Sequence, residues 1–381
     1  MSKSVGIHDD DTASRARRSA GSARAGEIHV DFFDASERGE VQAWIDLWGH
    51  WPGREVSAHP SYVRLFAREG DRVFAAAART PTGGILYPVI ARPISLEPWA
   101  RRETRGCDLT TAYGYGGPYA WNISEREALS FWSQFDFWAR ARGAITSFAR
   151  LSLFPEQILR FHGDVLDRGP NIVRRLDLAD DELWADYDGK VRKNVKRARQ
   201  EGVEIAFDPL GLRLDDFISV YESTMNRREA LSQYYFPRSF FEAIITDLPG
   251  QYVFVHAIAG GKVIASDIIL LSAQTAYFFL GGSLAEAFPK RPSDLLQHEN
   301  FRYCRDRGLK HCVLGGGYRP DDGVLRFKRA FAPGGERPFR VGVKTYDREG
   351  STRLIERRRE WERAQGREWN PVDGFFPPYR S

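Results

Sequence analysis

The chain has 381 residues, of which 42% are hydrophobic, and its formal net charge is +4. This length exceeds that of an ordinary domain, and 25 Phe, 15 Tyr and 10 Trp are ample for two packed cores. The mild excess of basic residues permits a polyanionic partner without requiring one. No apolar run approaches the ~20 residues of a membrane-spanning helix, which argues against an integral membrane protein.

The beginning of the chain and its cysteines indicate the compartment. Residues 1–26 are rich in Ser, Ala, Arg and Asp, show no apolar period and read as a disordered tail without a secretory signal. Cys107, Cys304 and Cys312 form no CxxC pair and no disulfide framework. We therefore expect a cytoplasmic protein.

The first expected domain spans 27–165 and alternates strand-like and helix-like patterns. Its expected elements in chain order are a strand at 27–33, helices at 35–49 and 60–68, strands at 72–78, 85–92 and 108–114, a helix at 124–142 and a strand at 145–151.

The second expected domain spans 170–348 and repeats that order. It has a strand at 203–207, helices at 215–228 and 238–246, strands at 252–259, 263–271 and 275–280, a helix at 293–307 and a strand at 311–314. A strand at 172–178 and a basic helix at 181–201 precede these elements, and a strand at 339–346 follows them. Residues 349–381 form a C-terminal helix and tail. The pattern predicts two copies of one α/β unit with mixed sheets flanked by helices.

The absence of several motifs narrows the chemistry. The sequence contains no GxxxxGK[ST], HExxH or G-x-S-x-G, and no paired Cys/His spacing, so we expect neither a metal nor a bound nucleotide cofactor. An enzyme of this kind would use an activated donor such as an ester or thioester, with positioning and oxyanion stabilisation as its means of catalysis.

The basic segment from Lys190 to Arg199 holds six basic residues in ten positions. At 100° per residue, Arg192, Lys196 and Arg199 share a helix face, with Lys193 and Arg197 beside it. These like charges repel one another unless an anion lies over them. RNA phosphates would suit this face, and a solvated face paired with nearby acids is the alternative.

Two further segments could bind a substrate. Tyr113-Gly-Tyr115-Gly-Gly-Pro118 follows a strand, and its glycines would let backbone N–H groups approach a ligand beside two tyrosines; a plain tight turn is the alternative. Arg227 and Arg228 end a helix ahead of Tyr235 and could hold a carboxylate or phosphate, although helix-end arginines also favour the helix dipole.

The stretch 314–331 combines three glycines, an acidic pair and a short apolar segment around Lys328. The pattern predicts a strand, a glycine turn and a helix that holds one lysine among apolar neighbours. Such a lysine would direct its ammonium at a cleft, where it could stabilise a carbonyl oxygen that gains negative charge, or at solvent.

These stretches resemble one family. The segment 192–203, Leu295-Leu296 in a later helix, Leu314-Gly-Gly-Gly and Leu325-Arg-Phe-Lys-Arg-Ala-Phe331 are similar to the FemABX aminoacyltransferases, which belong to the tandem acetyltransferase-like (GNAT) folds. The resemblance is clearest over 185–346 and more diffuse over 28–150. The resemblance is more specific for the fold of the superfamily than for the substrate.

The resemblance implies transfer of an aminoacyl group from aminoacyl-tRNA, as co-substrate, to an amine acceptor such as a peptide, a peptidoglycan precursor or a small molecule. It places Phe327 and Lys328 at the transfer site and makes Arg192, Lys193, Lys196 and Arg197 candidate tRNA contacts. From position alone we expect Asp108 as a base, and proton removal by the substrate itself is the alternative. The residues expected near the acceptor are Tyr113, Tyr115, Arg227, Arg228, Tyr235 and Ser283.

The sequence departs from the cell-wall members of this family in two respects, and two alternative functions are open. His59-Pro-Ser-Tyr62 replaces the Gln-Ser-x-x-Trp stretch of the cell-wall members, and the second domain has no inserted helical hairpin, which puts a peptidoglycan acceptor in doubt. An acyl-CoA-dependent N-acyltransferase is the first alternative. The segment 288–294 lacks glycines where such enzymes hold the CoA pyrophosphate, and its two prolines remove N–H donors. A non-catalytic RNA- or lipid-binding protein on the same fold is the second.

Overall fold

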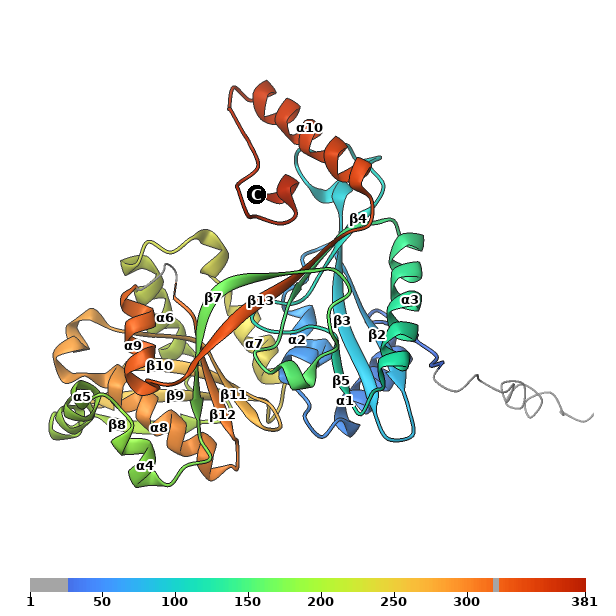
Figure 1. Ribbon diagram of the computed structural model, residues 1–381. Helices are drawn as coiled ribbons and strands as arrows, with labels where there is room; N and C mark the ends of the chain where they lie inside the picture. Colours follow the sequence, from blue (N-terminus) through green and yellow to red (C-terminus); the bar gives the residue numbers. More distant parts are fainter. Residues whose placement is uncertain (1–26, 318–321) are drawn as a thin grey trace, which may run out of the picture.

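The computed structural model describes residues 27–317 and 322–381. It consists of two α/β halves that share one continuous sheet, with the C-terminal segment above their junction (Figure 1). The first half contains β1 (Asp31–Asp34), α1 (Arg38–His50), α2 (Pro60–Arg64), β2 (Arg72–Arg79), β3 (Gly84–Pro93), β4 (Cys107–Thr110), β5 (Tyr119–Trp121), α3 (Glu125–Ala141) and β6 (Ala144–Arg150).

The second half repeats this element order, as the sequence predicted, except for the short β5, which was not predicted and pairs with β3. It contains β8 (Glu204–Asp208), α6 (Leu214–Arg227), α7 (Arg238–Asp247), β9 (Tyr252–Ala259), β10 (Lys262–Leu271), β11 (Thr275–Ser283), α8 (Pro292–Asp306) and β12 (His311–Gly315). Around it lie β7 (Asp164–Arg175), α4 (Asp180–Ala185), α5 (Gly189–Gln200), α9 (Gly323–Phe331), β13 (Glu336–Thr345) and α10 (Arg348–Ala364). The fold class is therefore the predicted one.

The sheet joins the two halves through β13 and β7, which lie between the strands of the first half and those of the second. Its strand order is β1-β2-β3-β4-β6-β13-β7-β12-β11-β10-β9-β8. β13 pairs antiparallel with both β6 and β7, and β7 pairs antiparallel with β12. The boundary expected between 165 and 170 thus falls inside β7, and β13 closes the sheet of the first half from the far end of the sequence.

Each half contains one parallel pair of strands at corresponding places. β4 runs parallel to β6, and β11 runs parallel to β12 from Thr275↔His311 to Tyr277↔Val313. The ladder between β11 and β12 ends after Val313, although both strands continue. Two parallel strands that separate in this way leave an opening between their carboxyl ends.

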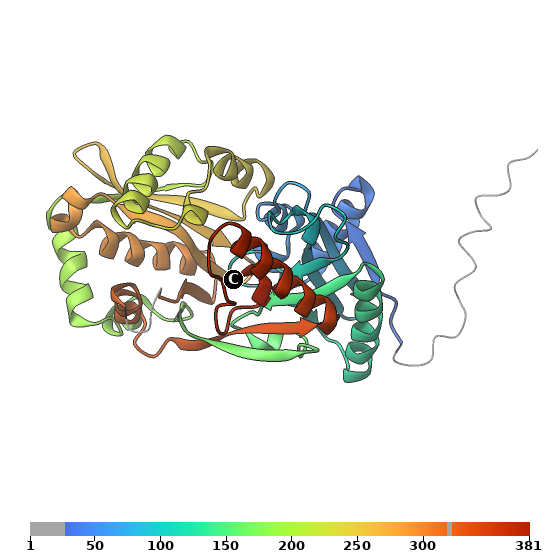
Figure 2. The same ribbon diagram turned by 90° about the horizontal axis from the view of Figure 1, so that it is seen from above.

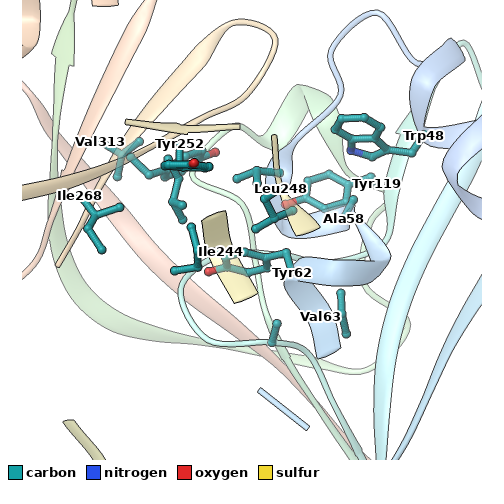
Figure 3. Packing of buried hydrophobic residues seen from close by; sticks show 14 of the residues in the cluster. Trp48, Ala58, Tyr62, Val63, Tyr119, Ile244, Leu248, Tyr252, Ile268 and Val313 are labelled. Carbon is teal, nitrogen blue, oxygen red and sulfur yellow. The ribbon is translucent and has the colours of Figure 1, made fainter. Parts of the chain in front are cut away.

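The buried residues form one cluster that crosses the junction. Trp48, Tyr62 and Tyr119 from the first half pack in the same cluster as Ile244 and Leu248 from the second, as Figure 3 shows. Burying this much aromatic and aliphatic surface stabilises a fixed arrangement of the two halves. A separate cluster, on the α5 and α8 side, packs those helices on the other face of the second half.

The C-terminal tail is anchored in the first half. α10 and the tail lie above the junction in both views (Figures 1 and 2). Tyr379 is fully buried, and its hydroxyl donates to the carboxylate of Asp108. Arg380 forms an ion pair with the same carboxylate. The tail is therefore part of the folded body.

The basic segment forms two helices where the sequence predicted one at 181–201. α4 ends at Ala185, and α5 begins at Gly189. The guanidinium of Arg192 donates to the carbonyl oxygens of Ala185 and Tyr187, which have lost their helical partners at this break. In the parts of the chain that the structure describes, no helix is both long and apolar enough to cross a bilayer.

Candidate functional site

A cavity of about 1400 Å³ lies between the two halves. Residues of both halves, of β7 and β13, and of the C-terminal tail line it. On the second-half side it enters the opening between β11 and β12, where 278–283 and 314–317 form opposite walls. The rigid packing across the junction holds these walls in place.

The glycine run and Lys328 meet at this opening. β12 ends at Gly315, whose φ of +81° is a left-handed conformation that a side chain disfavours. α9 follows, and the Asp322 side chain caps it by accepting from the backbone N–H of Leu325 at 2.7 Å. One turn later, Lys328 Nζ donates to the carbonyl oxygen of Gly316 at 2.7 Å.

Burial changes the acidity of this lysine. Desolvation lowers the pKa of Lys328 to about 8, against the opposing charge of Asp322. The ammonium is therefore the main form at neutral pH, yet it lies close to its titration point. Lys328 lines the cavity and is not the solvent-exposed lysine that the alternative interpretation supposed.

Tyr115 reaches the same point from the first half. A Cβ on Gly315 would lie 3.4 Å from Lys328 Nζ, 3.6 Å from Tyr115 Oη and 3.9 Å from Asn171 Oδ1. Tyr115 donates to Asn171 on β7. The structure thus brings together Lys328 and Tyr115, which lie more than 200 positions apart in the sequence. Phe327, 36% exposed, lines the cavity beside them.

Most, but not all, of the other expected substrate-binding residues lie at the cavity. Tyr113, Arg227, Arg228 and Ser283 line the cavity, whereas Tyr235 does not. The Arg227 guanidinium donates to the carbonyl oxygen of Ser283 at 2.9 Å and so fixes the end of β11. Arg227 and the exposed Arg228 both line the cavity, and their role in holding a carboxylate or phosphate stays a prediction.

Asp108 is not placed to act as a base on a substrate in the cavity. Its side chain is buried in β4, does not line the cavity and accepts from Thr146, Tyr379 and Arg380. All of these contacts stabilise the carboxylate within the protein. Its role in this geometry is to hold the C-terminal tail, so the catalytic expectation for Asp108 is corrected.

The basic helix α5 lies at the outer end of the second half, away from the cavity (Figure 1). Lys193 and Lys196 are exposed, and Arg197 lies 3.8 Å from Glu201 in an exposed ion pair. Arg192 is half-buried and caps α4, so it does not share a free face with Lys196 as expected. The face that remains open to an anion is smaller than the sequence indicated.

Sequence reasoning missed several cavity residues. Five arginines line the first-half end of the cavity: Arg68, Arg92, Arg150, Arg168 and Arg380. Arg150 donates to the backbone carbonyls of Thr111 and Ala112 and has no carboxylate partner among the described residues. Asp267 and Gln297 line the second-half end. The arginines near the ends of β3 and β6 could have been recognised in the sequence as candidate cavity residues. No local sequence pattern distinguished Asp267.

The fold and part of the sequence match known proteins. The family model of an acetyltransferase (GNAT) domain matches residues 186–329. FemX superposes with a TM-score of 0.58 and 12% identity, over 81% of this chain and 94% of that chain. The chain has a FemX-like tandem GNAT fold. L-PGS from Bacillus licheniformis shares this tandem fold with a TM-score of 0.51 and 13% identity, over 84% of this chain and 96% of that chain. No curated protein matches the sequence.

Within the GNAT fold, the opening between β11 and β12 and the glycine run lie inside the matched segment 186–329. Lys328 falls at its end. The first half has the same strand order and its own parallel pair, β4 and β6, without a family match.

Proposed function

We propose that the protein is an aminoacyltransferase that transfers an aminoacyl group from aminoacyl-tRNA to an amine acceptor. The observation that carries this proposal is the position of the Lys328 ammonium, which is held by Gly316 in a cavity between two halves. A cavity of this kind lets a donor enter from one half and an acceptor from the other. The coarser function, acyl transfer on a GNAT fold, is supported by the domain match.

In the proposed reaction the acceptor nitrogen attacks the carbonyl carbon of the aminoacyl ester. A C–N bond forms, the carbonyl oxygen becomes an oxyanion, and the C–O bond to the terminal ribose then breaks. The nitrogen loses one proton and the ribose oxygen gains one. Lys328 stabilises the oxyanion with an N–H that Gly316 does not use.

The acceptor is proposed to lie at the first-half end of the cavity, near Tyr113, Tyr115 and Arg228. Arg150 is desolvated there, and burial lowers its pKa without a carboxylate to compensate. A guanidinium in this state favours an acceptor that carries a carboxylate or phosphate beside its amine. Because Asp108 is bound within the protein, the substrates themselves are proposed to take up the proton that the acceptor nitrogen loses.

The tRNA is proposed to reach the second half from outside, with Lys193 and Lys196 of α5 against its phosphates. These lysines have no acidic partner among the described residues. The contact would be sequence-independent and sensitive to salt.

A second candidate, transfer from acyl-CoA, is favoured by the GNAT domain match. The start of α8 argues against it. Pro292 removes an N–H from the first turn, and Asp294 places a buried carboxyl there, bonded to Asn194 at 3.1 Å. An anion already present at a helix N-terminus opposes binding of a pyrophosphate.

The proposal is tested by incubating the full chain with tRNA charged with labelled amino acid and a panel of amines. Transfer of label that RNase abolishes is the expected result. Lys328→Ala should abolish it, whereas Lys262→Ala, at an exposed ion pair outside the cavity, should not. RNase-insensitive transfer that requires acyl-CoA would replace the proposed donor.

A further inference from the structure

The second-half end of the cavity contains a buried carboxyl group that the transfer chemistry does not use. Asp267 on β10 is 8% exposed and lines the cavity. Its Oδ2 accepts from Asn300 Nδ2 of α8 at 3.1 Å. No lysine, arginine or histidine of the described residues pairs with it. A carboxyl group taken out of water without a cation is costly to keep.

The neighbouring strand makes room for this carboxyl group. Asp267 pairs across the ladder with Gly281 of β11. A Cβ on Gly281 would lie 2.1 Å from Asp267 Oδ1, a distance that no side chain tolerates. Since Gly281 does not have a positive φ, the close approach of the carboxyl group is the reason that a glycine is needed here.

The amides around Asp267 are also incompletely satisfied. Gln297 on α8 is 4% exposed and lines the cavity, and its Nε2 has no hydrogen-bond partner among the described residues. Asn300 is fully buried, and its Oδ1 also has no hydrogen-bond partner among the described residues. Buried polar atoms without a hydrogen-bond partner are uncommon in folded proteins, because each one lowers stability.

The position of these groups relative to Lys328 follows from the strands. Continuing the β11–β12 register past Tyr277↔Val313 would place Gly281 level with Gly317. Lys328 is bound to Gly316 on that opposite wall. Asp267, beside β11, and Lys328, beside the end of β12, therefore line the same cavity.

We propose that Asp267, Gly281, Gln297 and Asn300, the Asp267 pocket, bind an ammonium group on the acyl group that is transferred. This inference rests on the proposed aminoacyl transfer and names the class of donor. With the acyl carbonyl beside Lys328, the ammonium of the same acyl group lies against Asp267, whose carboxyl group Asn300 Nδ2 holds in place. An acetyl group would leave the Asp267 carboxyl group without a charged partner, so the pocket discriminates against it.

The acidity of the empty pocket agrees with this assignment. Burial raises the pKa of Asp267 to about 8, so the carboxyl is mainly protonated at pH 7 without a ligand. An arriving ammonium stabilises the carboxylate and lowers that pKa. Binding near pH 7 therefore releases a proton from the protein, which a neutral ligand does not cause.

The ammonium has two chemical sources, the α-amino group of any aminoacyl group or the side chain of a basic one. Four amides of equal chain length separate them: lysinamide, norleucinamide, which keeps only the α-amine, 6-aminohexanamide, which keeps only the distal amine, and hexanamide, which has neither. Calorimetry on the full chain measures each affinity, and repetition in buffers of different ionisation enthalpy measures proton release.

We expect binding of the amides that carry the relevant amine, at least tenfold tighter than that of hexanamide, with proton release near pH 7. Asp267→Asn keeps the shape and should abolish both the preference and the release. Gly281→Ala, which displaces the carboxyl group, should do the same and provides a second test should Asp267→Asn not fold. Glu286→Gln removes an exposed carboxylate outside the cavity and should change neither.

Equal affinity for all four amides, or a preference that survives in both pocket variants, would overturn the proposal. Because this measurement needs no tRNA and no turnover, it is separate from the proposed function. If the protein prefers amides with an ammonium but does not transfer from tRNA, the assignment of the Asp267 pocket stands and aminoacyl-tRNA is rejected as the donor. Transfer from tRNA without the preference would keep the function and reject the pocket.

Discussion

Lys328 donates to the carbonyl oxygen of Gly316, twelve positions earlier in the chain, at 2.7 Å. The bond fixes the ammonium at the end of β12, where Gly315 leaves space that a side chain would fill. An ammonium has three N–H donors, and among the described residues Gly316 alone accepts from it. Within that part of the chain, two donors are left for a ligand in the cavity.

Removal of this ammonium should remove transfer. We expect Lys328→Ala to lower kcat by about 100-fold or more, as loss of an oxyanion donor does in other enzymes. Folding and tRNA binding should be unchanged, because the lysine lies at the cavity wall. The measurement is single-turnover transfer beside a melting curve. A variant with wild-type kcat would remove Lys328 from the mechanism.

The pH dependence of transfer should reveal the same group. The pKa of Lys328 is lowered from 10.5 to about 8 by burial, so the ammonium is present below pH 8 and lost above it. We expect kcat/KM to fall about tenfold per pH unit above that value. Lys328→Arg stays charged over this range, and its slower reaction should show no such descending limb. A limb that persists in this variant belongs to another group.

The contact between Asp108 and Arg380 predicts an effect on stability. Arg380→Ala should lower the free energy of unfolding by about 3–5 kcal/mol, because it leaves the buried carboxylate of Asp108 without its cation. Asp108→Asn should destabilise less and keep kcat near the wild-type value. Denaturant unfolding and transfer assays on both variants check this. A large loss of kcat with unchanged stability in Asp108→Asn would restore it as a base.

Glu55 should make stability depend on pH. Its carboxyl is fully buried, accepts from Tyr277 at 2.8 Å, and has its pKa raised from 4.5 to about 7 by burial. A raised folded-state pKa stabilises the fold below pH 4.5, and this stability is lost as the pH rises to about 7. Glu55→Gln should therefore be more stable than the wild type at pH 8, by up to about 3 kcal/mol.

The comparison of Glu55→Gln with the wild type should show no such gain at pH 4. Urea unfolding at both pH values measures the difference. A gain of equal size at pH 4 and pH 8 would mean that packing, and not ionisation, separates the two proteins.

The exposed lysines of α5 should affect tRNA binding alone. We expect the double change Lys193→Ala and Lys196→Ala to weaken tRNA binding and to lower the slope of log affinity against log salt by about 1 per lysine. Arg348→Ala, at an exposed residue of α10, is the matched control. Filter binding across salt concentrations checks it, and an unchanged slope would place the tRNA elsewhere.

The sequence predicted those parts of the fold that depend on local pattern. The order of elements in both halves followed from apolar periodicity and from turns such as Gly260-Gly261. The approach of Lys328 to the glycine run was also predictable, because one strand, one turn and one helix bring them together within fifteen residues. Local order of this kind needs no knowledge of the rest of the chain.

Contacts between distant residues were beyond the sequence. The sequence predicted Asp108 as a base because its partners Tyr379 and Arg380 lie more than 270 positions later and could not be foreseen. The sequence predicted one helix over the basic segment because no local pattern showed that Arg192 caps a break there. Asp267 carried no signal, since its environment comes from Gly281 and Asn300 on two other elements.

The place of β13 in the sheet has a consequence for synthesis of the chain. β6 ends at Arg150, and its partner β13 does not begin until Glu336. At ordinary translation rates the ribosome needs roughly 10–40 s to make the residues between them. Throughout that interval the edge of β6 is open to pairing with any other extended chain. We expect the nascent protein to depend on chaperones over this interval more than a protein whose first domain is complete before its second is made.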